Sequence, residues 1–209
     1  MVTKIIMNIC ILLAAGTSSR FGLKTRKQMF ILPDTQKTIL ETCIDNIIKT
    51  VDKIILVTNE DFYTKNRKII VIPNVINCRL KSIEVGLDYV NKNYSLSTKN
   101  IIIHDVARPY ITPQHIIDII KKTDVYSQYC MKLTNGLIYE GTQCVDRDCY
   151  MELCTPICIK YKICKIICKD KVPCEFIDIL NEMSLPFHLI PTSFRYIRKI
   201  TTLDDINII

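Results

Sequence analysis

"ILLAAGTSSRFGLKTRKQ" (residues 11–28) joins a run of apolar residues to a loop rich in positive charge. The apolar run ends at Gly16, three small hydroxyl residues come next, and the loop then carries four cations: Arg20, Lys24, Arg26 and Lys27. Ligands of open α/β sheets bind beyond the carboxyl ends of the strands, and a glycine there lets backbone N–H groups approach a phosphate. The stretch is therefore interpreted either as an anion-binding loop or as an ordinary strand–helix connection with solvated cations. It lacks the Gly-Lys-Ser/Thr sequence of a Walker loop.

Short apolar runs alternate with helical patterns over the first 120 residues, which is typical of βαβ units and a parallel sheet. The apolar runs at 53–58 and 68–73 are typical of buried strands in sheets covered by helices on both faces. We expect strands at 5–14, 53–58, 68–73 and 100–106, and helices over 40–51, 80–90 and 116–120. The sequence thus predicts an α/β fold with a mostly parallel twisted sheet and helices on both faces.

The pattern changes between Tyr126 and Pro156, where "LIYEGTQCV" predicts a hairpin because Gly136 precedes it and Gly141 lies within it. We interpret this part as an excursion from the main sheet, with residues 132–156 as a protruding β-arm. Helical pattern returns over 157–184 and a strand is expected near 187–191. Two residues could cap a short final helix: Thr202 and Asp204.

Composition limits the classes of protein to be considered. The chain has 209 residues, 48% of them hydrophobic and 23% charged, as in an ordinary globular domain. Its net charge is +7, yet it has no run of five basic residues, so an anionic small molecule is favoured over nucleic acid. No apolar stretch approaches the roughly 20 residues that span a bilayer, and we expect no membrane partner.

The chain carries eleven cysteines, eight of them between Cys130 and Cys174, but none are spaced as Cys-x-x-Cys. The apolar residues near the start lack a clear cleavage site and are interpreted as a core strand rather than a signal peptide. A cytoplasmic location with reduced thiols is expected. Buried thiols are favoured over a zinc site, which remains an alternative.

The segment "HDVARP" (104–109) places charged residues directly after an isoleucine-rich strand, where burial is costly without a partner. Asp105 could hold Mg²⁺, which prefers carboxylate and phosphate oxygens. Arg108 could grip a phosphate in a fork geometry. The alternative is an ion pair between these two residues. His104 is interpreted as a hydrogen-bonded packing residue.

Together the motifs resemble those of the sugar-alcohol-phosphate cytidylyltransferases, which include the 2-C-methyl-D-erythritol 4-phosphate and ribitol 5-phosphate enzymes. The resemblance covers nearly the whole chain in five ordered segments: "AAGTSSRFG…RKQ", "RLKSIEVGL" (79–87), "HDVARP", "VDR" with "TP" (145–147 and 155–156), and "KITT" (199–202). It implies one cytidylyltransferase domain over 1–209 with a Rossmann-like nucleotidyltransferase fold. It also implies a homodimer, in which the 132–156 arm serves dimerisation and substrate binding.

The resemblance implies a role for each matching residue. Asp105 would coordinate Mg²⁺ or another divalent cation, and CTP would be the co-substrate. The catalytic cations would be Arg20, Lys27 and Lys199. The nucleotide would be bound at Ala14, Ala15, Gly16, Thr17, Arg79 and Ser82. The alditol phosphate would be bound by Arg108 and, from a neighbouring subunit, by Arg147 and Thr155.

The implied reaction joins CMP to a sugar-alcohol phosphate with release of pyrophosphate. D-ribitol 5-phosphate is favoured as the acceptor because "IIIHDVARPYIT" and "SIEVGL" look closer to that branch, with 2-C-methyl-D-erythritol 4-phosphate of isoprenoid biosynthesis as the alternative. The same motifs would also suit a catalytically inactive relative that serves as a binding protein, or a nucleotidyltransferase that uses another base.

Three departures from the family pattern bear on whether the enzyme is active and which base it uses. The chain has "NVINC" before the Arg-x-x-Ser segment, where the family has glycines. Arg26 replaces the usual proline before Lys-Gln, and the asparagine ahead of the terminal lysine is also replaced.

Overall fold

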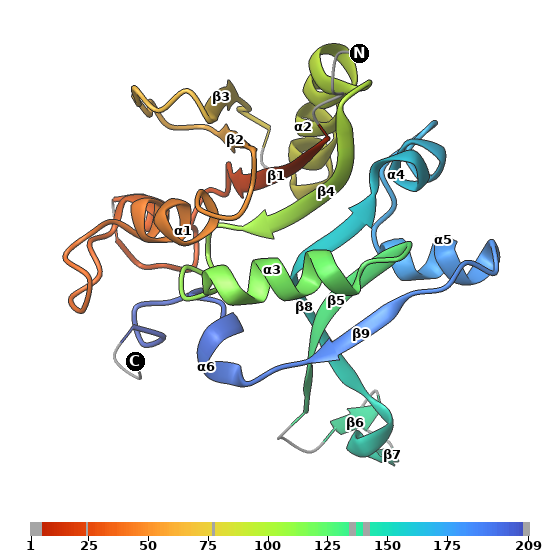
Figure 1. Ribbon diagram of the computed structural model, residues 1–209. Coiled ribbons are helices and arrows are strands. Elements are labelled where there is room, and N and C mark those ends of the chain that lie inside the picture. Colours follow the sequence, from red (N-terminus) through yellow and green to blue (C-terminus); the bar gives the residue numbers. More distant parts are fainter. Residues whose placement is uncertain (1–5, 24, 77, 134–136, 140–142, 207–209) are drawn as a thin grey trace.

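The computed structural model describes residues 6–23, 25–76, 78–133, 137–139 and 143–206. A seven-stranded sheet lies between two layers of helices, and a small hairpin projects from one end of it (Figure 1). The strands of the main sheet are β1 (Met7–Ala14), β2 (Lys53–Thr58), β3 (Ile69–Pro73), β4 (Thr98–Asp105), β5 (Tyr126–Lys132), β8 (Met151–Lys160) and β9 (His188–Pro191). The helices are α1 (Ile39–Ile47), α2 (Arg79–Tyr94), α3 (Pro113–Lys122), α4 (Tyr161–Ile167), α5 (Phe176–Glu182) and α6 (Phe194–Ile197).

Strand order in the main sheet is β3-β2-β1-β4-β8-β5-β9. Strands β3, β2, β1 and β4 run parallel, as do β5 and β9, while β8 is antiparallel to both of its neighbours. The mostly parallel α/β sheet predicted from the sequence is therefore confirmed.

Strand β1 shows why the sheet needs helices on both sides. Cys10 and Leu12 pack into a cluster with α1 and α3, while Ile9 and Ile11 face the opposite cluster with α2, α4 and α5. All four side chains are fully buried. A strand buried on both faces has no polar side to alternate with, which explains why residues 9–14 are all apolar.

Strand β3 differs from the prediction, because its residues 69–72 are only half-buried and Pro73 is exposed. It is the edge strand of the sheet and pairs with β2. An apolar run alone does not distinguish an edge strand from a central one.

The predicted helix over 157–184 is wrong at its start, since 157–160 continue strand β8 and α4 begins at Tyr161. The expected final helix is also absent from the described tail, where 202–206 form turns. Neither Thr202 nor Asp204 acts as its cap, and Asp205 instead accepts hydrogen bonds from the backbone amides of Thr201 and Thr202.

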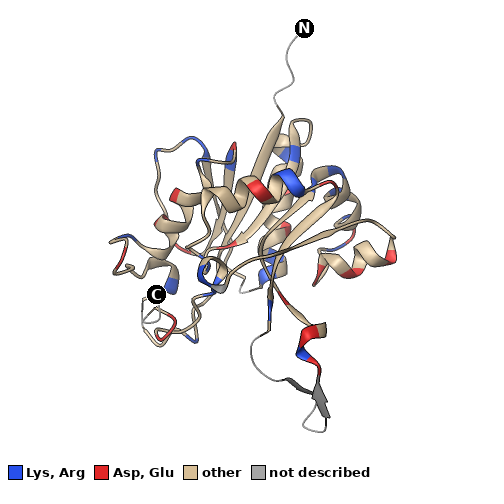
Figure 2. Ribbon diagram, turned by 60° about the horizontal axis from the view of Figure 1, so that its bottom comes forward, with Lys and Arg blue, Asp and Glu red and all other residues tan. Residues whose placement is uncertain are grey.

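The predicted hairpin is present as β6 (Leu137–Tyr139) and β7 (Gln143–Val145), which pair antiparallel. Gly136 and Gly141 lie outside the described residues. Strands β5 and β8 on either side of it belong to the main sheet, so the part of the arm that leaves the sheet is shorter than 132–156. A short 3-10 helix, η2 (Arg147–Cys149), follows the hairpin and carries acidic and basic residues away from the sheet (Figure 2).

In the part of the chain that the structure describes, no helix has the length and apolarity to cross a membrane. Lys and Arg residues are spread over several loops and helices rather than gathered on one element (Figure 2).

Candidate functional site

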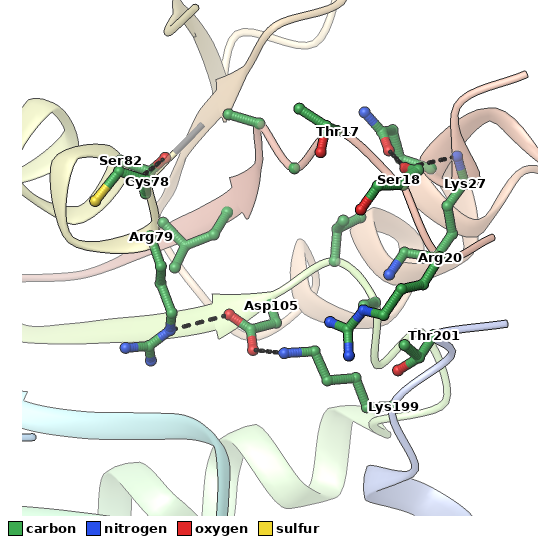
Figure 3. A pocket seen from close by; sticks show the side chains of 17 residues that line it. Thr17, Ser18, Arg20, Lys27, Cys78, Arg79, Ser82, Asp105, Lys199 and Thr201 are labelled. Carbon is green, nitrogen blue, oxygen red and sulfur yellow. Dashed lines mark hydrogen bonds and ion pairs between the residues drawn. The ribbon is translucent and has the colours of Figure 1, made fainter. Parts of the chain in front are cut away.

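A cavity of about 290 Å³ lies at the carboxyl end of the parallel part of the sheet. Strands β1 and β4 are neighbours, and their register places Leu13 opposite Asp105. The loop after β1, the segment after β4, the start of α2 and the C-terminal tail therefore meet there (Figure 3). Its wall is formed by Leu13, Ala15, Gly16, Thr17, Ser18, Ser19, Arg20, Lys27, Gln28, Cys78, Arg79, Ser82, Asp105, Val106, Ala107, Lys199 and Thr201.

The loop after β1 is closed by hydrogen bonds between its two ends. The Ser18 hydroxyl accepts a hydrogen bond from Lys27 N at 3.0 Å and donates one to Gln28 Oε1 at 3.2 Å. Gln28 is buried and its Nε2 donates to the carbonyl of Ala14 at 3.1 Å. These bonds fix Lys27, the first residue of the 3-10 helix η1 (Lys27–Met29), beside the cavity.

Positive φ angles in this loop occur at Ser18 (60°) and Gly22 (80°), whereas Gly16 does not have the left-handed conformation. A Cβ atom built on Gly16 would meet no other protein atom within 4 Å. The value of this glycine is therefore the space that it leaves in the cavity, rather than a left-handed turn.

Only part of the loop's charge faces the cavity. Arg20 and Lys27 lie in its wall. Arg26 instead binds Glu60, with 2.8 Å between Nε and Oε1, and Lys24 lies outside the described residues. The loop thus delivers two described cations to the site.

Asp105 is the acidic centre of the cavity (Figure 3). Its carboxylate oxygens lie 3.6 Å from Arg79 Nε and 3.4 Å from Lys199 Nζ. Burial alone would raise the pKa of Asp105, but Lys199, Arg79 and the further positive groups around it lower the pKa below its usual value. The carboxylate is therefore ionised at neutral pH, and its ion pairs are with these two cations rather than with Arg108.

Lys27 is a half-buried cation of the site. Its Nζ donates a hydrogen bond to the carbonyl of Ile200 at 2.8 Å. Burial, followed by the nearby charges of Lys199 and Arg20, lowers its pKa to about 8, while Asp105 acts in the opposite direction. An anion that entered the cavity would relieve this repulsion between cations.

The start of α2 forms the opposite wall. Ser82 is buried, its hydroxyl donates to the Cys78 carbonyl at 3.1 Å, and it accepts a hydrogen bond from Asn74 Nδ2 at 2.9 Å. Cys78 is the N-cap residue and makes no side-chain cap. The Cys78 side chain thus does not cap the first amides of α2. This helix start lies beside the cavity, where the positive end of the helix dipole favours an anion.

Comparison with known proteins identifies the family. Residues 8–136 match the family model for IspD, 2-C-methyl-D-erythritol 4-phosphate cytidylyltransferase. The chain belongs to this family. A curated 2-C-methyl-D-erythritol 4-phosphate cytidylyltransferase from Thermotoga neapolitana is 26% identical over 138 residues, which are 62% of this chain and 60% of that relative. The match therefore spans less than two thirds of the curated relative.

Solved structures share the fold. The bifunctional IspDF from Campylobacter jejuni has a TM-score of 0.79 at 19% identity and covers 96% of this chain, which spans 53% of that one. The 2-C-methyl-D-erythritol 4-phosphate cytidylyltransferase (IspD) from Francisella tularensis has a TM-score of 0.71 at 21% identity, with 96% of this chain and 97% of that chain covered. At these identities the likeness shows the architecture of the IspD-family chain and no more.

The structure brings together most of the residues that the sequence singled out, but not all of them. Ala14 is buried behind the loop. Arg108 is also buried, donates to the Ile197 carbonyl and lies 3.9 Å from Glu152, so it does not line the cavity. His104 is a packing residue, as expected: it is fully buried and its Nε2 lies 3.1 Å from the Arg108 carbonyl.

The two residues assigned to a neighbouring subunit lie in different places. Thr155 is buried in its own subunit, where its hydroxyl accepts a hydrogen bond from Asp105 N at 3.2 Å. Within this chain Thr155 therefore supports Asp105, and its expected contact with a substrate of a neighbouring subunit stays a prediction. Arg147 is exposed in η2, beyond the hairpin and outside the cavity wall.

Sequence reasoning missed the residues that hold the site in shape, chiefly Gln28, Asn74 and Asp205. Each acts through hydrogen bonds to residues that are defined only once the chain is folded, so no spacing in the sequence could have identified their roles. Among the described residues, no group of three potential ligands for a metal ion occurs, and the ten cysteines whose side chains are described are free thiols.

Proposed function

We propose that the chain is a cytidylyltransferase that joins CMP from CTP to the phosphate of a sugar alcohol, with 2-C-methyl-D-erythritol 4-phosphate as the favoured acceptor. The observation that carries this proposal is the cavity in which Arg20, Lys27 and Lys199 surround one buried carboxylate, Asp105. A triphosphate supplies the negative charge that three neighbouring cations require. The family of the chain supports cytidine as the base.

The cavity wall suggests how the nucleotide would lie. Its phosphates would occupy the side formed by Gly16, Thr17, Arg20 and Lys27, where backbone amides and cations meet. Its cytidine would lie along Ala15, Arg79 and Ser82, on the side of α2. Ala14 would act through its carbonyl, which holds Gln28 and so shapes the loop.

The reaction requires little proton transfer. The second pKa of a phosphate monoester is about 6, so the acceptor is largely dianionic at neutral pH. One of its oxygens would form a bond to the α-phosphorus while the bond from that phosphorus to the bridging α–β oxygen breaks, and pyrophosphate would leave with the electron pair. Lys27 and Lys199 would stabilise the negative charge that spreads over the phosphates, which is the main requirement of phosphoryl transfer.

A divalent cation fits the donor set of this site. Mg²⁺ is usually bound by one or two carboxylates together with substrate phosphates, and the cavity offers the Asp105 carboxylate next to the proposed phosphate position. Such an ion would screen charge between the phosphate groups.

The favoured acceptor differs from the preference drawn from the sequence. The "IIIHDVARPYIT" and "SIEVGL" segments favoured D-ribitol 5-phosphate, whereas the matching family model and the curated relative are both described as 2-C-methyl-D-erythritol 4-phosphate cytidylyltransferase. We therefore place the methylerythritol compound first. Arg147 remains a candidate for binding the acceptor from a second copy in a homodimer, because it lies on the arm that projects away from the sheet (Figure 1).

The test is pyrophosphate release from CTP and Mg²⁺, with the two acceptors offered separately. We expect turnover with 2-C-methyl-D-erythritol 4-phosphate that disappears in Asp105→Ala and persists in Asp61→Ala, a control that removes an exposed carboxylate elsewhere. Faster turnover with D-ribitol 5-phosphate would reverse the order of acceptors. CTP binding without turnover on either would indicate an inactive binding protein, and preference for UTP would refute the assignment of the base.

A further inference from the structure

The C-terminal tail carries Lys199 and Thr201 into the nucleotide cavity, although neither belongs to a helix or strand. Helix α6 ends at Ile197, and the tail then runs beside the segment after β4. A side chain in irregular structure can act at a defined position only if other contacts hold the backbone. Whatever fixes this tail therefore fixes one of the cations of the site.

Two backbone contacts attach the middle of the tail to the rest of the site. Ile200 N donates to the Ala107 carbonyl at 2.8 Å, and the Ile200 carbonyl accepts the hydrogen bond from Lys27 Nζ at 2.8 Å. The Ile200 side chain is fully buried. The residue after Lys199 is thus tied both to the segment after β4 and to the loop after β1.

The Asp205 carboxylate binds the tail on both sides of Lys199. Its Oδ1 accepts a hydrogen bond from Arg198 Nη2 at 3.0 Å. Its Oδ2 accepts from the backbone amides of Thr201 at 2.8 Å and Thr202 at 2.9 Å, and from the Thr202 hydroxyl at 3.1 Å. One side chain therefore joins the residue before Lys199 to the residues after Ile200.

We propose that Asp205 is a positioning residue of the nucleotide site, which holds Lys199 against Asp105 by binding the tail on both sides of it. The proposal rests on the function proposed above, because Lys199 acts there on the phosphates. Asp205 itself does not line the cavity.

The charge of Asp205 suits this role. Burial alone would raise its pKa, but the amides of Thr202 and Thr201 and the Arg198 guanidinium lower the pKa to about 2. The carboxylate is therefore charged at neutral pH. Hydrogen bonds to an ionised acceptor are roughly twice as strong as neutral ones, so removal of the charge weakens all four together.

The neighbouring residue provides a matched control. Asp204 is exposed, carries the same side chain and lies one position away. Asp205→Asn and Asp204→Asn make the same chemical change at adjacent positions. Only Asp205→Asn weakens the contacts around Lys199.

The first readout does not depend on activity. Hydrogen exchange at the amides of Thr201 and Thr202 should accelerate about tenfold or more in Asp205→Asn and stay unchanged in Asp204→Asn. Lys199 should also react faster with an amine-acylating reagent, measured by mass spectrometry, once it is released from Asp105. Equal exchange and equal labelling in the two variants would overturn the proposal, whether or not the protein turns over CTP.

The second readout separates positioning from a general loss of stability. We expect kcat for pyrophosphate release to fall about tenfold in Asp205→Asn, which is less than the roughly hundredfold loss of a whole stabilising group. In a Lys199→Ala background the same substitution should cost less than twofold, because the residue that it positions is gone. An undiminished loss in that background would refute the role.

If Asp205→Asn does not fold, Arg198→Met removes the other partner of the Arg198–Asp205 contact. Hydrogen exchange at the Thr201 amide should then be faster, and unchanged exchange would refute the proposal. Absence of CTP binding and turnover in the wild type would instead refute the proposed function, while the exchange and labelling experiments would still decide the role of Asp205.

Discussion

The lowered pKa of Lys27 makes a quantitative prediction about nucleotide binding. With an ordinary pKa of 10.5, Lys27 would be almost fully charged at pH 9. With a pKa of about 8, it is mostly charged at pH 7 and only about one tenth charged at pH 9. If the charged form binds CTP, affinity should fall roughly tenfold between these two values of pH.

The sign of this effect follows from the charges. Deprotonation removes a positive charge that attracts the triphosphate, so binding weakens as pH rises through 8. Bound CTP should in turn raise the pKa of Lys27, because an anion favours the cationic form. The alkaline limb should therefore appear in kcat/KM, which reports the free enzyme, and move to higher pH in kcat.

The assay is calorimetric titration of CTP with Mg²⁺ between pH 7 and pH 9.5. Lys27→Arg is the control, since a guanidinium stays charged over this whole range. Its affinity for CTP should be nearly independent of pH, even if it is weaker than that of the wild type at pH 7. A wild-type profile that is flat to pH 9.5 would refute the lowered pKa, and an unchanged alkaline limb in Lys27→Arg would assign the titration to another group.

Two further predictions concern residues behind the site. Gly86→Ala places a Cβ 2.5 Å from Ile11 Cγ2, so we expect the protein to lose about 1–3 kcal/mol of stability. The Tm should fall while the affinity for CTP is retained, and an unchanged Tm would contradict this packing. His104 is fully buried and its pKa is lowered by burial to about 4, so the unfolded chain binds more protons between pH 6.5 and 4 and stability should fall by up to about 3 kcal/mol over that range. Urea unfolding at pH 7 and 4.5 should show a smaller loss in His104→Gln, and an equal loss would assign the effect to other groups.

The fold was predictable where the sequence pattern has one structural solution. The apolar runs within β1, β2 and β4 predict buried parallel strands, and the structure contains them. The prediction fails where one sequence pattern suits two kinds of secondary structure. The apolar residues within 157–160 suit a strand or a helix equally, and only their pairing with β4 and β5 makes them a strand. Burial of β3 likewise depends on its place at the sheet edge, which no local pattern encodes.

The sequence predicted the part of the site that is formed by charged residues directly after strands. Arg20, Lys27 and Asp105 come after strands whose carboxyl ends meet in space, so their approach could be inferred. The direction of the Arg108 side chain could not be inferred in this way, because its guanidinium turns to the Ile197 carbonyl and Glu152. Nothing in the sequence indicated a role for Asp205, since its hydrogen-bond partners lie in an irregular tail whose path is set by tertiary contacts.

Whether this cavity holds CTP is decided most sharply by a comparison of Gly16→Ala with the wild type. The added methyl group meets no other protein atom within 4 Å and points into open space at the cavity wall, so thermal unfolding should be unchanged. It occupies space that we assign to the nucleotide, and the Kd for CTP measured by calorimetry should rise at least about tenfold, since inserted atoms in a filled site cost roughly 1–3 kcal/mol. We therefore predict unchanged stability together with weakened binding. Equal affinity for CTP in a folded Gly16→Ala protein would place the nucleotide elsewhere in the molecule.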